Sequence, residues 1–153
     1  MIARKLKEFL EKNDVKYEVI PHPTSYTAQE TAETAHIPGT QIAKTVIVNI
    51  DGDLAMAVLP ANQKVILQEL REITGADDVR FAHEDDFENM FPGCETGAMP
   101  PFGNLYGMDV YVAPGLTQQE EIVFNAGSHR DLVKMSYRDF ERLVEPQVLS
   151  FST

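Results

Sequence analysis

The chain has 153 residues, of which 43% are hydrophobic, and its formal net charge is −11. Length and composition fit one globular domain that buries roughly two-thirds of its unfolded surface on folding. The acidic balance argues against extended binding to a nucleic-acid backbone, because such binding requires many Lys and Arg side chains.

The charge is unevenly distributed along the chain. Acidic residues concentrate between Glu69 and Glu95, whereas the first sixteen residues are net basic. A second, mild basic cluster lies between Arg130 and Arg142. Any contact with a nucleic acid should therefore be small and local.

The N-terminal residues, the apolar segments and the cysteine content bear on the cellular compartment that we expect. Residues 1–7 alternate with charge and lack the apolar core of a signal peptide, and no segment approaches 18 apolar residues. Cys94 is the one cysteine, which excludes an internal disulfide framework. We expect a cytoplasmic protein that does not contact a membrane.

Hydrophobic spacing and turn residues predict alternating helices and strands. Residues 3–13 show helical spacing, the capping-box pattern of Thr27 and Glu30 begins a second helix, and Asp51-Gly52-Asp53 joins two β-rich runs as a hairpin. The predicted helices cover residues 3–13, 28–36, 63–73, 83–90 and a last segment from 136. The predicted strands cover residues 17–20, 43–50, 54–60, 79–82, 109–112, 121–125 and 131–135. Without a repeat or a linker, this order favours a single α/β or α+β domain over residues 1–153.

A lone lysine, Lys44, enters the apolar run of residues 43–48. On chemistry alone, such a lysine most often lays its stem along the sheet edge and points its ammonium group to water. The alternative is a fixed cation beside a pocket, where it would hold an anionic or carbonyl oxygen.

Two loops have the residue types of a binding site. Residues 97–103 form a loop bracketed by glycines and stiffened by two prolines. It is either a rigid connector or a fixed set of backbone N–H groups that suits an oxyanion. Residues 125–129, Asn-Ala-Gly-Ser-His, are either a hairpin turn or the rim of a pocket.

Other chemistries lack support in the sequence. The four histidines have no metal-ligand spacing with each other, with Cys94 or with a carboxylate, so we expect no metal and no cofactor. Cys94 has no nucleophile motif around it and is interpreted as a partly buried thiol. No Walker loop, GxSxG or strand-linked GxGxxG occurs.

Taken in order, five segments resemble the YbaK/prolyl-tRNA-synthetase-associated family of aminoacyl-tRNA editing domains, over the full length of the chain. The segments are Thr27-Ala28-Gln29-Glu30, Ile42-Ala43-Lys44-Thr45-Val46-Ile47-Val48, Leu59-Pro60-Ala61, Gly97-Ala98-Met99-Pro100-Pro101-Phe102-Gly103 and Phe124-Asn125-Ala126-Gly127-Ser128-His129. The resemblance implies a mixed β-sheet curled into a barrel-like core with helices outside. It also implies hydrolysis of the ester that joins a wrong amino acid to the 3′ end of a tRNA.

The resemblance also assigns roles to residues. The family's essential lysine falls on Lys44, and its GxxxP motif falls on Gly97 and Pro101. The resemblance implies Lys44 and Gly97 as the catalytic positions. The substrate-binding residues that we predict beside them are Thr45, Ala98, Met99, Pro100, Pro101, Phe102, Asn125, Gly127, Ser128 and His129. The implied partner is the acceptor end of a mischarged tRNA, with an aminoacyl-tRNA synthetase as a further candidate.

The sequence departs from the family pattern at one position, and two alternative functions remain open. Family members that remove alanine from proline tRNA carry Asn after the lysine, whereas this chain has Thr45, so the amino acid that is removed stays open. One alternative is a noncatalytic module that binds an aminoacyl or nucleotide-like ligand beside a synthetase. The other is a metabolic hydrolase of a small activated ester or amide.

Overall fold

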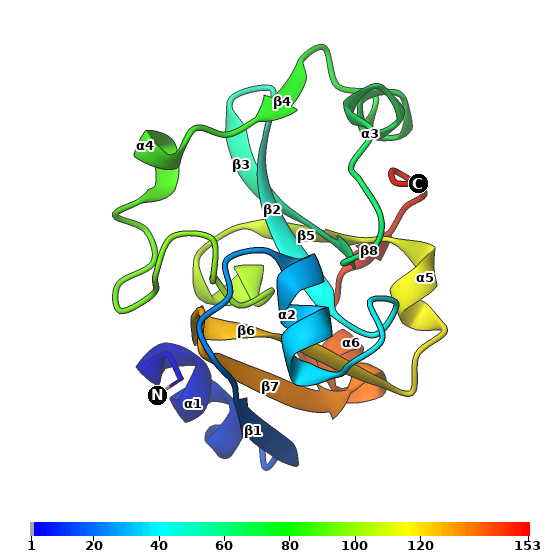
Figure 1. Cartoon of the computed structure of the whole chain (residues 1–153). Coiled ribbons are helices and arrows are strands. Elements are labelled where there is room, and N and C mark those ends of the chain that lie inside the picture. The colour runs from blue at the N-terminus through cyan, green and yellow to red at the C-terminus, as the bar shows by residue number, and fades with distance from the viewer. Residues whose placement is uncertain (1) are drawn as a thin grey trace.

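The computed structural model describes residues 2–153 as helices surrounding two β-sheets (Figure 1). The helices are α1 (Arg4–Lys12), α2 (Ala28–Ala35), α3 (Leu67–Thr74), α4 (Glu84–Phe87), α5 (Pro114–Thr117) and α6 (Tyr137–Val144), with a 3-10 turn, η1 (Gly103–Leu105). The strands are β1 (Tyr17–Pro21), β2 (Ala43–Ile50), β3 (Asp53–Pro60), β4 (Val79–Phe81), β5 (Asp109–Val112), β6 (Glu121–Ser128), β7 (Asp131–Ser136) and β8 (Gln147–Val148). None of the helices within residues 2–153 is long and apolar enough to cross a membrane.

The sheets have three and five strands, in the orders β1-β7-β6 and β4-β2-β3-β5-β8. A single parallel bridge between Ile42 and Val123 connects them, and the Val123 N–H donates to the Gln41 carbonyl at 3.1 Å. The mixed α/β class predicted from the sequence is confirmed. The term barrel-like is too strong, because the two sheets meet at this bridge and do not close.

The gap between the sheets is covered by α2, which lies across β2 and β6 (Figure 1). Alanines 28, 32 and 35 of α2 pack against Ile42 and Val123 at the bridge. Half of the predicted capping box is present, since the Thr27 hydroxyl accepts the Glu30 N–H at 3.0 Å, whereas the Glu30 carboxylate accepts the N–H of Tyr26 and not that of Thr27. The N-terminus of α2 is thereby fixed beside the start of β2.

On the other side of the sheets, a cluster of aromatic rings fills the core. Phe102 is fully buried, and its ring centroid lies 6.1 Å from that of Phe9, 5.6 Å from Phe124 and 5.4 Å from Phe140. These contacts bring α1, β6 and α6 to one point. Phe102, Phe124 and Phe140 are 0% exposed and Phe9 is partly buried, so their contacts stabilise this part of the core.

Most predicted elements are confirmed, and the differences have physical causes. The helix predicted from residue 63 begins only at Leu67, because the preceding residues pair with the C-terminal segment: the Lys64 and Ile66 N–H groups donate to the Thr153 and Phe151 carbonyls. The helix predicted over 83–90 is limited to α4. β6 extends beyond 125 to Ser128 through a bulge, and the short α5 and β8 were not predicted.

Candidate active site

A pocket of about 160 Å³ lies where β2 lacks a neighbouring strand. β4 pairs only with residues 48–50 of β2, so the first half of β2 has an open edge. Asn125 of β6, the N-terminal end of α2 and the loop after residue 96 close the other sides. The lining residues are Tyr26, Ala28, Ala43, Lys44, Thr45, Val46, Gly97, Met99 and Asn125.

The open strand edge contributes backbone groups to the pocket. The carbonyls of Gln41 and Ile47 accept hydrogen bonds at this edge, from the Val123 and Ala82 N–H groups. Successive residues of a strand direct their backbone groups to alternate edges. The N–H and C=O of Thr45 therefore point to the same edge, where no strand pairs with them within residues 2–153.

Lys44 is a half-buried cation at this edge. Its Nζ donates to the Ala61 carbonyl at 3.3 Å, and no carboxylate within the described chain forms an ion pair with it. Burial lowers the pKa of the Lys44 ammonium group, and the positive charge of Lys64 lowers it further. A partly desolvated cation without a counter-ion favours the binding of an anionic or strongly polarised oxygen.

Among residues 97–99, opposite Lys44, one backbone amide has no acceptor within the described chain. The Gly97 N–H donates to the thioether of Met99 at 3.2 Å, and the Ala98 N–H donates to the Glu95 carbonyl at 3.0 Å. The Met99 N–H has no acceptor among residues 2–153. Because a thioether is a weak acceptor, a ligand oxygen could also compete for the Gly97 N–H.

A β-bulge holds this loop from behind. Gly127, at φ +107°, lies in the bulge between Asn125 and Ser128, and its N–H and C=O bond with Ala98 and Glu95, each at 2.8 Å. The Nε2–H of His129 donates to the Thr96 carbonyl at 2.9 Å. Gly127 and His129 therefore position the loop and do not line the pocket.

The other predicted binding residues also lie outside the pocket lining. The Ser128 hydroxyl donates to Asp131 at 2.7 Å and accepts two N–H groups of the hairpin turn. Four residues of the loop, Ala98, Pro100, Pro101 and Phe102, are buried, and Phe102 belongs to the hydrophobic core. The structure thus brings five predicted residues to one pocket, namely Lys44, Thr45, Gly97, Met99 and Asn125.

Asn125 presents an unsatisfied acceptor. Its side-chain Oδ1 is buried and has no hydrogen-bond partner among the described residues. Leaving such an oxygen unpaired costs about 1–3 kcal/mol, so a ligand donor at this point would be favourable.

Four lining residues were not among the predicted site residues, namely Tyr26, Ala28, Ala43 and Val46. Tyr26 precedes the N-cap Thr27, and Ala28 is the first residue of α2. The segments 27–30 and 42–48 were recognised as part of the resemblance, but no binding role was assigned to Ala28, Ala43 or Val46. An aromatic residue directly before the N-cap Thr27, within an otherwise polar segment, was the available indication.

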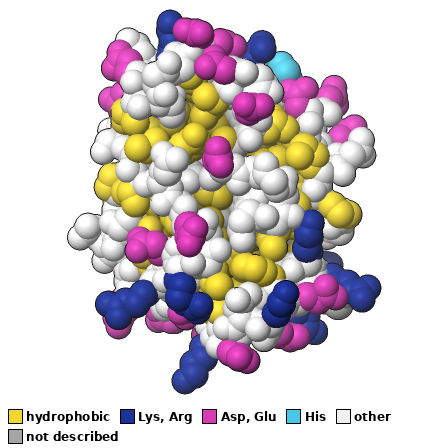
Figure 2. Space-filling view, turned by 180° about the vertical axis from the view of Figure 1, so that it is seen from behind, with side chains coloured by type: hydrophobic (Ala, Val, Ile, Leu, Met, Phe, Trp, Pro, Cys, Tyr) yellow, Lys and Arg dark blue, Asp and Glu magenta, His cyan; other side chains and the backbone are white. Residues whose placement is uncertain are grey.

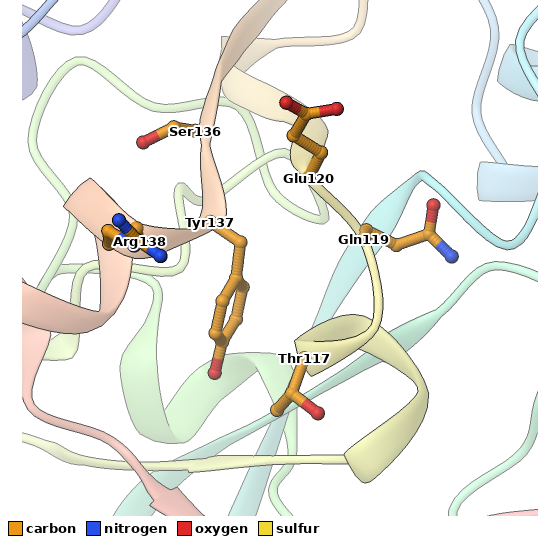
Figure 3. Close-up of a pocket in the computed structure, with 6 residues that line it drawn as sticks. All are labelled: Thr117, Gln119, Glu120, Ser136, Tyr137 and Arg138. Atoms are coloured by element: carbon orange, nitrogen blue, oxygen red, sulfur yellow. The ribbon is translucent and has the colours of Figure 1, made fainter.

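A second hollow, of about 410 Å³, lies at the opposite end of β6 and β7. Its lining residues are Thr117, Gln119, Glu120, Ser136, Tyr137 and Arg138. Although it is larger, Figure 3 shows that the polar ends of these side chains point in different directions and do not converge on a common point. No predicted site residue lines this hollow, so we place the candidate site at the β2 edge.

The residues that could carry other chemistry lie elsewhere. Cys94 does not line the pocket; its Sγ lies 4.0 Å from the Tyr106 hydroxyl, and burial raises the pKa of the thiol. Residues 2–153 contain no group of three or more His, Cys, Asp or Glu side chains that could hold a metal ion. The pocket therefore offers one cation, backbone amides and an amide oxygen.

Gly97→Val is expected to lower any catalytic rate in this pocket roughly tenfold to hundredfold, because a displaced loop misplaces its amides. Gly97 adopts φ +86°, and an added Cβ would lie 3.4 Å from His129. Gly93→Val is the matched control, since Gly93 has φ +79° with nothing within 4 Å. Thermal unfolding should show a similar loss of stability in both variants. Steady-state kinetics should show a lower rate in Gly97→Val alone. Equal rates in both would make the loop a connector.

Comparison with known proteins identifies similar chains. The family model described as "Aminoacyl-tRNA editing domain" matches residues 22–143. Proline–tRNA ligases of Staphylococcus saprophyticus and Staphylococcus aureus are 25% and 26% identical to the chain, over 140 and 145 residues. These matches cover 86% and 89% of this chain but only 25% of each ligase, so the chain spans about a quarter of the length of these relatives.

Two solved structures have the same fold. One is a hypothetical protein with a TM-score of 0.86 and 19% identity, covering 98% of this chain and all of the other. The second is provisionally described as a trans-editing enzyme for prolyl-tRNA synthetase, with a TM-score of 0.83 and 20% identity. That match covers 98% of this chain and 96% of the other.

Proposed function

The chain belongs to the aminoacyl-tRNA editing domain family, and we propose that it hydrolyses the ester of a mischarged tRNA in the pocket between Lys44 and the Gly97–Met99 loop. The observation that carries the proposal is the meeting of these two segments. They are about fifty residues apart in the sequence, yet they line one small pocket.

The pocket has the groups that ester hydrolysis needs. A water oxygen adds to the ester carbonyl carbon, and the carbonyl oxygen becomes an oxyanion. The Met99 N–H and the Lys44 ammonium donate to that oxyanion or to the adjacent phosphate. The ester C–O bond then breaks, and the water proton passes to the departing ribose oxygen. The free hydroxyl of the same ribose would position the water, so no protein nucleophile is required.

The amino acid would be held by the remaining groups. The unpaired Oδ1 of Asn125 is a suitable acceptor for the α-ammonium group of the ester. The small volume of the pocket favours small side chains and excludes bulky ones by steric clash. Because the ligase relatives act on proline tRNA, small amino acids on proline tRNA are the first substrates to test.

The tRNA would contact the protein over a limited basic surface. Figure 2 shows Lys and Arg side chains along the lower edge of the molecule, with Asp and Glu side chains among them. In α1, Arg4 pairs with Glu8 at 2.8 Å and Lys5 lies 5.0 Å from the Tyr106 ring. Lys7 and Lys12 are then the candidates for phosphate contacts, which predicts weak affinity with a small salt dependence.

A deacylation panel tests the proposal. The purified protein is incubated with mischarged tRNAs, including proline tRNA carrying small amino acids, and ester loss is compared with the spontaneous rate. Catalysed loss from at least one mischarged tRNA supports the proposal. Saturable binding without hydrolysis would favour the noncatalytic module. Hydrolysis of simple esters that tRNA does not inhibit would favour the metabolic hydrolase.

The pH dependence of kcat/KM should reflect the deprotonation of the Lys44 ammonium group. After subtraction of spontaneous hydrolysis, kcat/KM should fall as the pH rises, because deprotonation removes the charge that holds the oxygen. The fall should lie below the ordinary lysine value of 10.5, since the pKa of Lys44 is lowered. In Lys44→Arg, whose guanidinium stays charged, any remaining activity should lose this alkaline fall. An unchanged alkaline fall in Lys44→Arg would contradict the assignment.

A further inference from the structure

The ring of Tyr26 stands at the mouth of the candidate pocket with most of its surface open to solvent. It is 72% exposed, yet it contributes to the same lining as Lys44 and Gly97. An exposed aromatic ring alone requires no explanation. Its position at a pocket and its fixed backbone make it informative.

The backbone at Tyr26 is anchored on both sides. The Ser25 N–H donates to the His129 carbonyl at 3.2 Å, and the Tyr26 N–H donates to the Glu30 carboxylate at 3.3 Å. The next residue, Thr27, caps α2. The ring is therefore presented from a hydrogen-bonded turn.

Tyr26 does not serve to pack the helix. A hydrophobic residue before an N-cap often packs against the fourth helical residue. Here that residue is Thr31, which is buried and bonds through its hydroxyl to Ser25 at 2.8 Å. The single ring partner of Tyr26 within residues 2–153 is His129, with centroids 5.0 Å apart and planes tilted by 54°. The rest of the ring surface stays available.

We propose that Tyr26 is a stacking platform for the nucleobase of the terminal nucleoside that carries the ester. The inference rests on the proposed function, which places the ester carbonyl beside Lys44 and Met99. The base is joined to the ester through one ribose, so it reaches only the immediate surroundings of the pocket. At that mouth, Tyr26 supplies a flat apolar surface, and stacking on an aromatic ring accepts any base.

Fluorescence tests the stacking without requiring hydrolysis. The chain contains no Trp, so Tyr26→Trp introduces a single reporter at this position. Phe81→Trp is the matched control, because Phe81 is 50% exposed and does not line the pocket. Adenosine 5′-monophosphate and the trinucleotide CCA should quench Tyr26→Trp saturably, whereas ribose 5-phosphate should not. No saturable quenching, or equal quenching in Phe81→Trp, would overturn the proposal.

Kinetics then separate stacking from a structural role. Tyr26→Ala should lower kcat/KM for aminoacyl-tRNA roughly tenfold to hundredfold, as expected for loss of one stacked base. It should lower hydrolysis of the methyl ester of the same amino acid far less than hydrolysis of the aminoacyl-tRNA, and Tyr26→Trp should keep most of the activity on tRNA. Equal losses on both substrates, or no loss on tRNA, would contradict the inference. If the wild-type protein hydrolyses neither substrate, the proposed function fails, while the quenching still decides the stacking.

Discussion

Lys44→Met is expected to lower kcat/KM for deacylation about a hundredfold to a thousandfold while leaving the fold intact. Methionine keeps a straight apolar stem but removes the charge that would hold the ester oxygen or the phosphate, and loss of one such donor has an effect of this size. The lost bond to the Ala61 carbonyl should reduce the free energy of unfolding by only about 1 kcal/mol. Single-turnover deacylation measures the first effect, and circular dichroism during thermal unfolding measures the second.

Lys64→Met is the matched control for this prediction. Lys64 is exposed and close enough to lower the pKa of Lys44, but it does not line the pocket. Its replacement should change the rate far less than Lys44→Met and should move the alkaline fall of the wild-type profile to higher pH. Wild-type turnover by Lys44→Met, or equal losses in the two variants, would remove Lys44 from the mechanism.

Phe102→Ala is expected to lower the free energy of unfolding by about 3–5 kcal/mol, the usual cost of removing a fully buried aromatic ring. Its ring contacts Phe9, Phe124 and Phe140, which come from three different elements, so the cavity cannot collapse through a local shift. Urea unfolding followed by circular dichroism measures the change in midpoint and slope.

The same variant decides between two roles of Phe102. The sequence predicts Phe102 as a substrate-binding residue, whereas the structure shows a 0% exposed core residue. Met90→Ala is the control, since Met90 is 38% exposed and should cost little. A small stability loss in Phe102→Ala, combined with a selective loss of activity, would support the substrate contact instead.

Local signals explain why much of the fold could be predicted. The Thr27 N-cap and the Asp51-Gly52-Asp53 turn each act within a few residues, and both α2 and the β2–β3 hairpin formed as expected. The late start of α3 and the strand β8 depend on the C-terminal segment, which pairs with residues far away in the sequence. No local pattern contains that information.

The segments that form the site could be predicted from the sequence, but which of their residues line the pocket could not. Lys44 and Gly97 line one pocket, yet Gly127 and His129, which belong to an equally suggestive segment, hold the loop from behind. Which residues face the ligand depends on the bulge in β6 and on the open edge of β2. Both features result from strand register, which the sequence of either strand alone does not define.

The most direct test is a crystal structure of the protein with a terminal adenosine that carries an amino acid through a stable amide in place of the ester. We expect the amide oxygen to lie within hydrogen-bonding distance of the Lys44 ammonium group or the Met99 N–H, with the α-ammonium group beside Asn125. Occupation of the hollow at Tyr137, or of any other surface, with the β2 edge left empty would contradict this expectation.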